Sequence, residues 1–253
     1  MSQTLRQQQI VGLLREVQAS TVLDLAGHFH VSDETIRRDL KSLAESGIVE
    51  KFHGGVRLND VAWEAPFERR LQEQAIAKRR IAAAAAELIE DEATILLDNS
   101  SSSCFLAREL ATKRRRLTAI TFSVEVAGIL SSAGPHHRVI LPGGELRADD
   151  RTIVGASAID FASQFTPGLF VMSVAAASPA RGCMDFDMFE TEFKRAMIPL
   201  ADRVMLLLDS SKYARHGLIH VCGWQSVNVF VSEAPPPEGI AAALDQAEIV
   251  IAP

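Results

Sequence analysis

The feature that most constrains the fold of this sequence is an alternation of short apolar segments and helical segments that begins near residue 93. Strands are expected at 93–97, 117–121, 138–141, 169–174, 204–208, 226–231 and 249–252. Helices are expected near 103–112, 123–132, 153–162, 189–198 and 237–246. Because such alternation is typical of strands joined by crossover helices, residues 91–253 are predicted to form an α/β domain with a mainly parallel sheet.

The N-terminal residues show a different order of elements. Apolar side chains recur at helical spacing over residues 5–17, and Thr21 can cap a second, short helix. Ser32 can cap a third helix, in which Ile36, Leu40 and Leu43 form one apolar stripe. Three closely spaced helices of this kind predict a helix-turn-helix unit.

Two short strands follow these helices, at 48–52 and 56–58, and His53, Gly54 and Gly55 form the turn between them. Three helices and a hairpin are the order of a winged helix-turn-helix, so we predict a small DNA-binding domain over residues 1–58. Residues 59–90 are expected to be a linker and a connecting segment, with one long helix over 67–89.

The third helix is the expected DNA-reading element. Its side chains that point away from the apolar stripe are polar or basic: Thr35, Arg37, Arg38 and Lys41. Arginine can bond guanine edges or phosphate oxygens with two parallel hydrogen bonds, and Ser32 and Thr35 can donate to phosphates. The alternative is that the two arginines are merely solvated. The net charge of −6 gives DNA binding no support, so the prediction rests on where these residues fall.

The string VSDETIRRDLKSLAESGIVEKFHGGV closely resembles the signature of the DeoR family of repressors. The match runs in order from Val31 through the T-I-R-R-D-L segment and Gly47 to Gly55. The resemblance implies that Ser32, Thr35, Arg37 and Arg38 contact DNA, and that the H-G-G turn (His53, Gly54, Gly55) is the tip of the wing. Asp39 is expected to pair with an arginine or a backbone amide.

A run of small polar residues follows the first strand of the large domain and leads directly into a helix. It comprises Asp98, Asn99, Ser100, Ser101, Ser102 and Ser103. Backbone amides in the first turn of a helix lack partners within the helix, and serine hydroxyls add donors, so this turn suits a phosphate. The alternative is a plain capped loop.

The large domain is similar to the sugar-phosphate-sensing domain of DeoR repressors, which is related to ribose-5-phosphate isomerase. The family's D-S-G-T-T turn corresponds to residues 98–103, although this chain lacks the glycine. Its L-x-G-G motif corresponds to Leu141–Gly144, and its D-S-S-K motif ends at Lys212. The resemblance implies a phosphorylated sugar or polyol effector that binds the 98–103 turn, with Gly143, Gly144 and Lys212 nearby. The Glu190/Lys194 pair, four residues apart, is equally suited to a ligand contact and to an ion pair that stabilises the helix.

We therefore expect a transcriptional regulator, by family default a repressor of a carbohydrate-utilisation operon, that binds double-stranded operator DNA as a homodimer or homotetramer. The alternatives are a sugar-phosphate isomerase or deaminase-like enzyme and a winged-helix protein that binds only other proteins. An enzyme needs an acid or base near the substrate, and residues 173–178 offer no carboxylate where the related isomerases have D-G-A-D-E.

Other expectations follow from composition. No apolar run reaches the roughly 18–20 residues of a membrane-spanning helix, and the N-terminus has no signal-peptide core, so we expect a cytoplasmic protein without membrane contact. The three cysteines, Cys104, Cys183 and Cys222, are scattered and form no C-x-x-C motif. They are expected to be reduced and mostly buried, and no metal or cofactor is expected.

Overall fold

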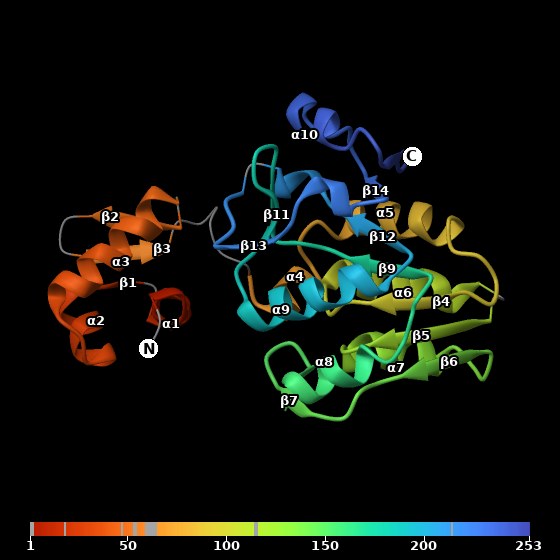
Figure 1. Cartoon of the computed structure of the whole chain (residues 1–253), viewed down its shortest axis with the longest axis horizontal. Helices are drawn as coiled ribbons and strands as arrows, with labels where there is room; N and C mark the ends of the chain where they lie inside the picture. Colours follow the sequence, from red (N-terminus) through yellow and green to blue (C-terminus); the bar gives the residue numbers. More distant parts are fainter. Residues whose placement is uncertain are drawn as a thin grey trace.

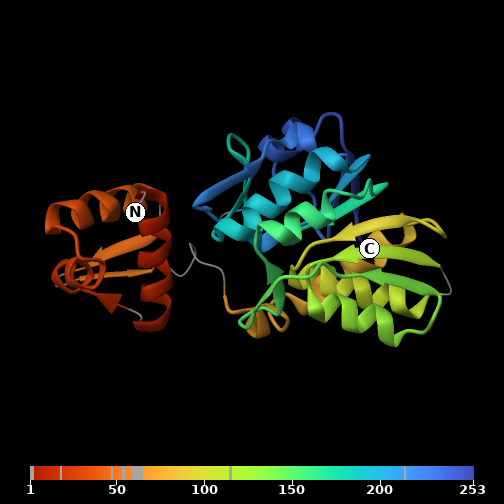
Figure 2. The ribbon, with the colours of Figure 1, turned by 60° about the horizontal axis from the view of Figure 1, so that its bottom comes forward.

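The computed structural model of the chain describes residues 3–17, 19–46, 48–52, 55–58, 65–113, 116–213 and 215–253. Figure 2 shows the N-terminal domain as a lobe of its own beside a larger domain. The predicted fold class, a small helix-turn-helix domain followed by an α/β domain, is confirmed.

The described residues of the N-terminal domain form three helices and a three-stranded sheet. Its elements are α1 (Gln3–Val17), β1 (Ala19–Ser20), α2 (Val22–Phe29), α3 (Asp33–Glu45), β2 (Val49–Phe52) and β3 (Gly55–Leu58). Thr21 and Ser32 cap α2 and α3 as predicted, by accepting the N–H groups of Asp24 and Thr35. The sequence did not predict β1, because two residues are too short to show any periodicity, yet β1 pairs with β3 and widens the wing sheet.

A buried ion pair fastens α1 to α3. Asp39 is almost fully buried, and its carboxylate accepts hydrogen bonds from Arg6 Nε at 2.5 Å and Arg6 Nη2 at 3.3 Å. A bidentate guanidinium contact is the form of ion pair with the most geometric specificity. The expectation that Asp39 has a structural role is therefore confirmed, and the pair orients the helix that carries Arg37 and Arg38.

The prediction of one long helix over 67–89 is wrong. The chain forms α4 (Phe67–Arg70), a turn, and α5 (Ala75–Glu87). The break occurs at Gln74, whose φ of 52° lies in the left-handed region that does not continue a helix. The side chain of Lys78 stabilises this corner by donating from Nζ to the carbonyls of Arg70 at 2.6 Å and Glu73 at 2.8 Å.

The larger domain is built on a seven-stranded parallel sheet with the order β15-β14-β12-β9-β4-β5-β6. Figure 1 shows β14 to β6 in this order from top to bottom. The strands are β4 (Thr94–Leu97), β5 (Leu117–Thr121), β6 (His137–Ile140), β9 (Leu169–Met172), β12 (Arg203–Leu207), β14 (Val229–Ser232) and β15 (Glu248–Ile251). All seven lie within a few residues of the predicted positions.

Alternate residues of these strands enter two separate apolar cores, one on each face of the sheet. On β4, for example, Ile95 and Leu97 belong to one core and Leu96 to the other. The first core contains residues of α5, α6 (Ser101–Thr112) and α7 (Val124–Ser132). The second contains residues of α8 (Ala156–Ala162), α9 (Met188–Met197) and α10 (Glu238–Ala243). Both faces are thus covered by helices, as a parallel sheet requires.

Short antiparallel strands outside the main sheet were missed by the sequence analysis. They are β7 (Glu145–Arg147) with β8 (Thr152–Val154), and β10 (Ala176–Ser178) with β11 (Gly182–Asp185) and β13 (Ile219–Cys222). The helix expected near 153–162 therefore starts later, after Gly155, whose φ of 107° interrupts the helical path. The expected strand 226–231 likewise begins at Val229, because a 3-10 turn, η3 (Trp224–Ser226), precedes it.

Gly182 is required by the close approach of β11 to β13. Its φ is 73°, and a Cβ there would lie 2.4 Å from the carbonyl oxygen of Cys222. We expect Gly182→Ala to lower the free energy of unfolding by roughly 2 kcal/mol or more. Gly128→Ala, in an exposed position of α7 with open space around it, should instead raise it by about 0.5–1 kcal/mol. Urea unfolding measures both, and equal stability of the two variants would contradict this account.

Candidate functional site

The third helix presents its basic side chains to solvent. Arg37 and Arg38 are exposed, whereas Ile36 and Leu40 on the opposite side are buried in the domain core. Among the described residues, neither guanidinium has a hydrogen-bond or ion-pair partner. Lys41 is also exposed and lies 3.9 Å from Glu45. The helix therefore offers two unengaged guanidinium groups on one surface.

The structure describes only some of the other residues that were predicted to contact DNA. Ser32 and Thr35 lie at the start of α3, and their hydroxyls bond each other at 2.9 Å. His53 and Gly54, the predicted wing tip, lie outside the described residues, as does Gly47. The flanking strands β2 and β3 are joined on the surface by Arg57 and Glu50, whose side chains are 2.9 Å apart.

The second candidate site lies where the order of the parallel strands reverses. From β4 the chain proceeds outward through β5 and β6, and then returns to β9 on the other side of β4. Ligands of such sheets bind beyond the carboxyl ends of the strands at this switch point. Asp98 lies at that end of β4, and its backbone N–H donates to Val171 of β9 at 3.1 Å.

The serine-rich turn after β4 is internally hydrogen bonded. Asp98 Oδ1 accepts from the Ser100 N–H at 3.0 Å and from the Ser103 hydroxyl at 2.6 Å. Ser100 caps α6 by accepting the Ser103 N–H at 3.1 Å. The first-turn N–H groups of Ser101 and Ser102 have no hydrogen bond among the described residues. The turn is thus both a capped loop and a helix start with amides still available to an anion.

A buried lysine gathers carboxylates from three elements behind this turn. Lys194 of α9 is about 1% exposed, and its Nζ lies 2.6 Å from Asp185, 3.7 Å from Asp98 and 3.9 Å from Glu190. The expected Glu190/Lys194 pair exists, but the shortest contact is with Asp185 of β11. Burial opposes the charge of Lys194, yet these carboxylates outweigh it and raise its pKa above the usual value.

Arg147 of β7 forms a second charge cluster next to the first. Its guanidinium contacts Asp150 at 2.6 Å, Asp187 at 3.1 Å and Glu190 at 3.2 Å. Burial alone would raise the pKa of Glu190, but the positive charges of Lys194, Arg70 and Arg147 outweigh it and lower that pKa to about 2. Glu190 therefore links the two clusters as a carboxylate.

A basic pocket of about 270 Å³ opens at the start of α6. Two of the predicted effector residues, Ser101 and Lys212, line it. The α4–α5 corner and the segment after β12 supply the other lining residues, which are Arg70, Glu73, Gln74, Lys78, Asp209, Ser211 and Arg215. Four side chains in this pocket are basic and two are acidic. Arg70 and Lys78 were not predicted to lie at the site, because they fall in what was expected to be a continuous helix.

Lys212 is held in place by acceptors at the switch point. Its Nζ donates to the Val174 carbonyl at 2.7 Å and to the Ser173 hydroxyl at 3.1 Å. The Ser173 N–H in turn donates to Asp98 Oδ2 at 2.8 Å. The lysine of the basic pocket and the aspartate of the serine turn are therefore connected through Ser173.

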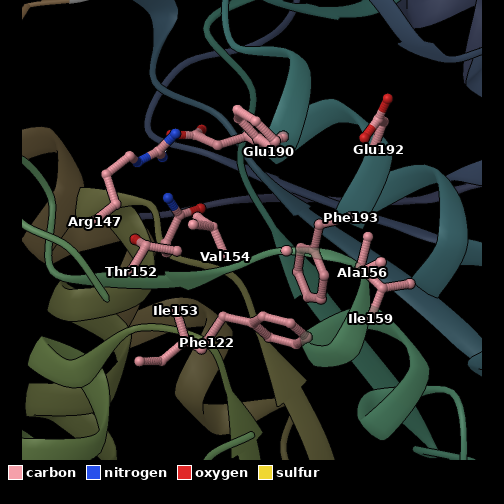
Figure 3. A pocket seen from close by; sticks show the side chains of 13 residues that line it. Phe122, Arg147, Thr152, Ile153, Val154, Ala156, Ile159, Glu190, Glu192 and Phe193 are labelled. Carbon is pink, nitrogen blue, oxygen red and sulfur yellow. The ribbon is translucent and has the colours of Figure 1, made fainter. Parts of the chain in front are cut away.

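A slightly larger, mostly apolar pocket of about 290 Å³ has Glu190 in its lining. Figure 3 shows Arg147 pointing toward Glu190 at one end, and Phe122, Phe193 and Ile159 gathered at the other. Asn99 also lines this pocket, and its amide donates to Asp150 at 3.0 Å. Of the predicted effector residues, Asn99 alone lines this pocket.

The other predicted effector residues do not line either of these two pockets. Asp98, Ser100, Ser102 and Ser103 are buried in and around the turn itself. Gly143 and Gly144 lie between β6 and β7, and a Cβ at Gly144 would be 2.8 Å from Ile153 Cγ2. Gly144 thus lets this connection pack against β8, which is a packing role that its motif alone does not reveal.

The larger domain contacts the N-terminal domain through residues that directly flank β10, β11 and β13. Phe186 and Ala175 are buried in the same apolar cluster as the core of the N-terminal domain, and Leu218 packs against that cluster. The Phe186 carbonyl accepts a hydrogen bond of 3.4 Å from Gln8 of α1. Asp185 also accepts the Ala175 N–H at 2.9 Å, so the Lys194 cluster is one residue away from this contact.

The low pKa of Glu190 predicts a pH-dependent contribution to stability. A carboxylate whose pKa is lowered on folding stabilises the protein above its unfolded pKa, and this contribution is lost as the pH falls toward about 2. At pH 7, Glu190→Gln should be less stable by on the order of 2–3 kcal/mol, and the deficit should shrink between about pH 5 and pH 2. Denaturant unfolding over this pH range measures the deficit. Glu192→Gln, an exposed glutamate on the same helix, is the control, and parallel pH profiles for both variants would contradict the assignment.

Other features of the described residues bear on the class of protein. No helix among them is both long and apolar enough to cross a membrane. No cluster of three or more histidine, cysteine or acidic side chains in this part of the chain is arranged to hold a metal ion.

Comparison with known proteins identifies both domains. Residues 6–62 match the profile of the DeoR-like helix-turn-helix domain, and residues 73–234 match that of the DeoR C terminal sensor domain. Of the solved structures, ribose 5-phosphate isomerase A from Methanocaldococcus jannaschii is similar over 56% of each chain, with 13% identity and a TM-score of 0.43.

Curated relatives match along nearly the whole length. The chain is 32% identical over 240 residues to the glycerol-3-phosphate regulon repressor of Escherichia coli, which covers 95% of this chain and 94% of the relative. It is 30% identical over 246 residues to the HTH-type transcriptional repressor CsqR of Escherichia coli, and the match covers 97% of this chain and 94% of CsqR. It is 32% identical over 229 residues to the HTH-type transcriptional regulator GolR of Listeria innocua, and the match covers 90% of this chain and 89% of GolR. The chain therefore belongs to the DeoR family of transcriptional regulators.

Proposed function

We propose that this protein represses transcription in the cytoplasm by binding operator DNA through α3, and that a phosphorylated sugar or polyol releases it. DNA binding through α3 is supported by two exposed guanidinium groups without partners among the described residues, those of Arg37 and Arg38. They lie on a helix whose opposite face is buried. The similar glycerol-3-phosphate regulon repressor supports a phosphorylated three-carbon polyol as one candidate effector.

The effector's phosphate is proposed to bind in the basic pocket. Ser101 lines the pocket at the start of α6, where first-turn amides lack partners within the helix and the helix dipole is positive. Lys212, Lys78 and Arg215 add positive charge around the same space. Because these groups favour a dianion over a neutral molecule, the pocket should select phosphorylated compounds over their parent sugars.

The α4–α5 corner gives a route from this pocket toward the DNA-binding domain. Arg70 and Lys78 line the pocket, and α4 begins just after the segment that leads from the wing. A ligand that binds one arrangement of this corner better than another shifts the balance between DNA-binding and non-binding forms. The contact between Phe186 and α1 is a second route by which the sensor can affect the helix-turn-helix.

The protein is proposed to act without catalysis. Asp185 and Asp187 are the first carboxylates that follow residues 173–178 in the sequence. Asp185 is occupied by Lys194 and the Ala175 N–H, and Asp187 caps α9 by accepting the Glu190 N–H at 2.9 Å. A general base needs to reach a substrate proton, and both groups already serve structural contacts.

We also propose that the protein binds DNA as a dimer or a tetramer. A single winged-helix domain of this kind makes few phosphate contacts, and linking two half-site contacts raises affinity through effective concentration. Light scattering of the protein with and without operator DNA should show two or four chains per complex. A monomer that binds the operator with full affinity would contradict this proposal.

Operator affinity should depend on the arginines of α3. If Arg38 reads a base edge, Arg38→Ala should weaken specific binding by about 1–3 kcal/mol. If it contacts only phosphate, the loss should be similar for all sequences and the salt slope should fall by about one unit. Fluorescence anisotropy with labelled operator measures both. Arg203→Ala, an exposed arginine of the sensor domain, is the control. Unchanged affinity in both Arg37→Ala and Arg38→Ala would refute DNA reading by α3.

Ligand-dependent stabilisation should depend on the basic pocket. With the effector at about 100-fold its Kd, the unfolding midpoint should rise by roughly 5–10 °C, since binding adds about 2.7 kcal/mol. A thermal-shift panel of phosphorylated sugars and polyols, each paired with its unphosphorylated parent, measures this. Arg215→Ala and Lys212→Ala should lose the shift, and Arg138→Ala, an exposed arginine of β6, should keep it. A shift that survives in both pocket variants would place the ligand elsewhere.

A further inference from the structure

Two of the three cysteines face each other across neighbouring strands. Cys183 lies in β11 and Cys222 at the end of β13, and the antiparallel register of these strands makes them direct partners. Directly opposed residues in an antiparallel pair have Cα atoms about 4.5–5.5 Å apart. Disulfides form when this distance is about 4.4–6.8 Å. The backbone therefore already provides the spacing that a disulfide needs.

The side chains of the pair point to the same side of the small sheet. Both belong to the same apolar core, where Cys183 is fully buried and Cys222 is 7% exposed. The neighbouring Cys183 thiol lowers the pKa of Cys222, an effect to which the positive charge of Lys194 adds, whereas the Cys222 thiol and burial raise the pKa of Cys183. Cys222 is therefore the thiol that ionises first, and Cys183 is the adjacent thiol.

A pocket opens beside this pair. It has a volume of about 350 Å³, and Gly182, Gly223, His220 and Trp224 are among its lining residues. Gly182 precedes Cys183 and Gly223 follows Cys222, so a chain neighbour of each cysteine lines the pocket. A water molecule occupies about 30 Å³ in the liquid, so a pocket of this volume has room for a molecule of two oxygen atoms such as hydrogen peroxide.

The third cysteine has none of these properties. Cys104 is fully buried in the core on the opposite face of the main sheet, and burial raises the pKa of its thiol to about 12. A thiol that stays protonated and enclosed is a poor nucleophile. Cys104 therefore provides an internal control within the same chain.

We propose that Cys183 and Cys222 form a redox-sensitive site that a hydroperoxide converts to a disulfide. The Cys222 thiolate attacks one peroxide oxygen, the O–O bond breaks, and the departing hydroxide takes a proton and leaves as water. The Cys183 sulfur then attacks the resulting sulfenic acid, the S–S bond forms, and the S–O bond breaks. The hydroxyl leaves with the Cys183 proton as a second water. Two thiols are oxidised by two electrons, and one peroxide is reduced to two waters.

The position of the pair gives the disulfide a structural consequence. β11 continues from Cys183 to Asp185, which holds Lys194, and then to Phe186, which packs with the DNA-binding domain. A covalent link between β11 and β13 restrains the strand that carries both of these contacts. The oxidised protein should therefore unfold at a higher temperature than the reduced protein.

The test uses the full chain. The reduced protein is treated with a small molar excess of hydrogen peroxide, unfolded, alkylated, and digested without reductant for mass spectrometry. The expected result is loss of two of the three thiols, one linked peptide pair that joins Cys183 to Cys222, and an alkylated Cys104. Dithiothreitol should restore all three thiols and return the unfolding midpoint to that of the reduced protein.

Variants assign the two roles. Cys183→Ala should leave Cys222 as a sulfenic acid that dimedone labels, whereas Cys222→Ala should leave Cys183 unlabelled. The proposal is refuted if the wild-type chain keeps three thiols after peroxide treatment, if Cys104 reacts as fast as the pair, or if the linkage joins different chains. Because these readouts come from the wild-type protein, they hold even if a variant folds poorly.

Discussion

The buried positive charge of Lys194 is the interaction on which the ligand-binding region of the sensor domain depends. Its ammonium group lies among Asp98 of the serine turn, Asp185 of β11 and Glu190 of its own helix. Removing one partner from such a buried cluster leaves an uncompensated charge, which is strongly destabilising. Since Phe186 follows Asp185 and packs against the DNA-binding domain, the cluster connects the switch point of the sheet to the interface between the domains.

The basic pocket depends on the same arrangement. Lys212 reaches the turn through Ser173, whose N–H donates to Asp98. An anion at the start of α6 would therefore change the charge balance of a network that is already complete without it. The exposed arginines of α3 lie in a domain with its own core, fastened by Arg6 and Asp39, so DNA contacts and effector contacts are built from separate residues.

Periodic segments of the sequence predicted the fold well. All seven parallel strands and the three helices of the N-terminal domain were expected near their observed positions, because long apolar patterns and helix caps are local signals. The site was predicted in part: Ser101 and Lys212 meet in one pocket, and Asn99 lines another.

Contacts that depend on tertiary structure could not be predicted. The left-handed Gln74 breaks the expected long helix and turns Lys78 toward the pocket, and no local pattern marks that position. The partner of Lys194 was expected to be Glu190, one turn away, whereas Asp185 comes from a four-residue strand that shows no alternation in the sequence. The register that opposes Cys183 and Cys222 is equally non-local, since 38 intervening residues separate them.

The most direct test of the whole account is release of DNA by a phosphorylated ligand. A labelled operator, selected by the protein from random DNA, would be titrated with the protein in the presence of glycerol 3-phosphate or other sugar and polyol phosphates, and of each unphosphorylated parent. The account predicts that at least one phosphorylated compound lowers operator affinity at concentrations where its parent has no effect. Unchanged affinity with every phosphorylated compound, or equal release by a neutral parent, would contradict it.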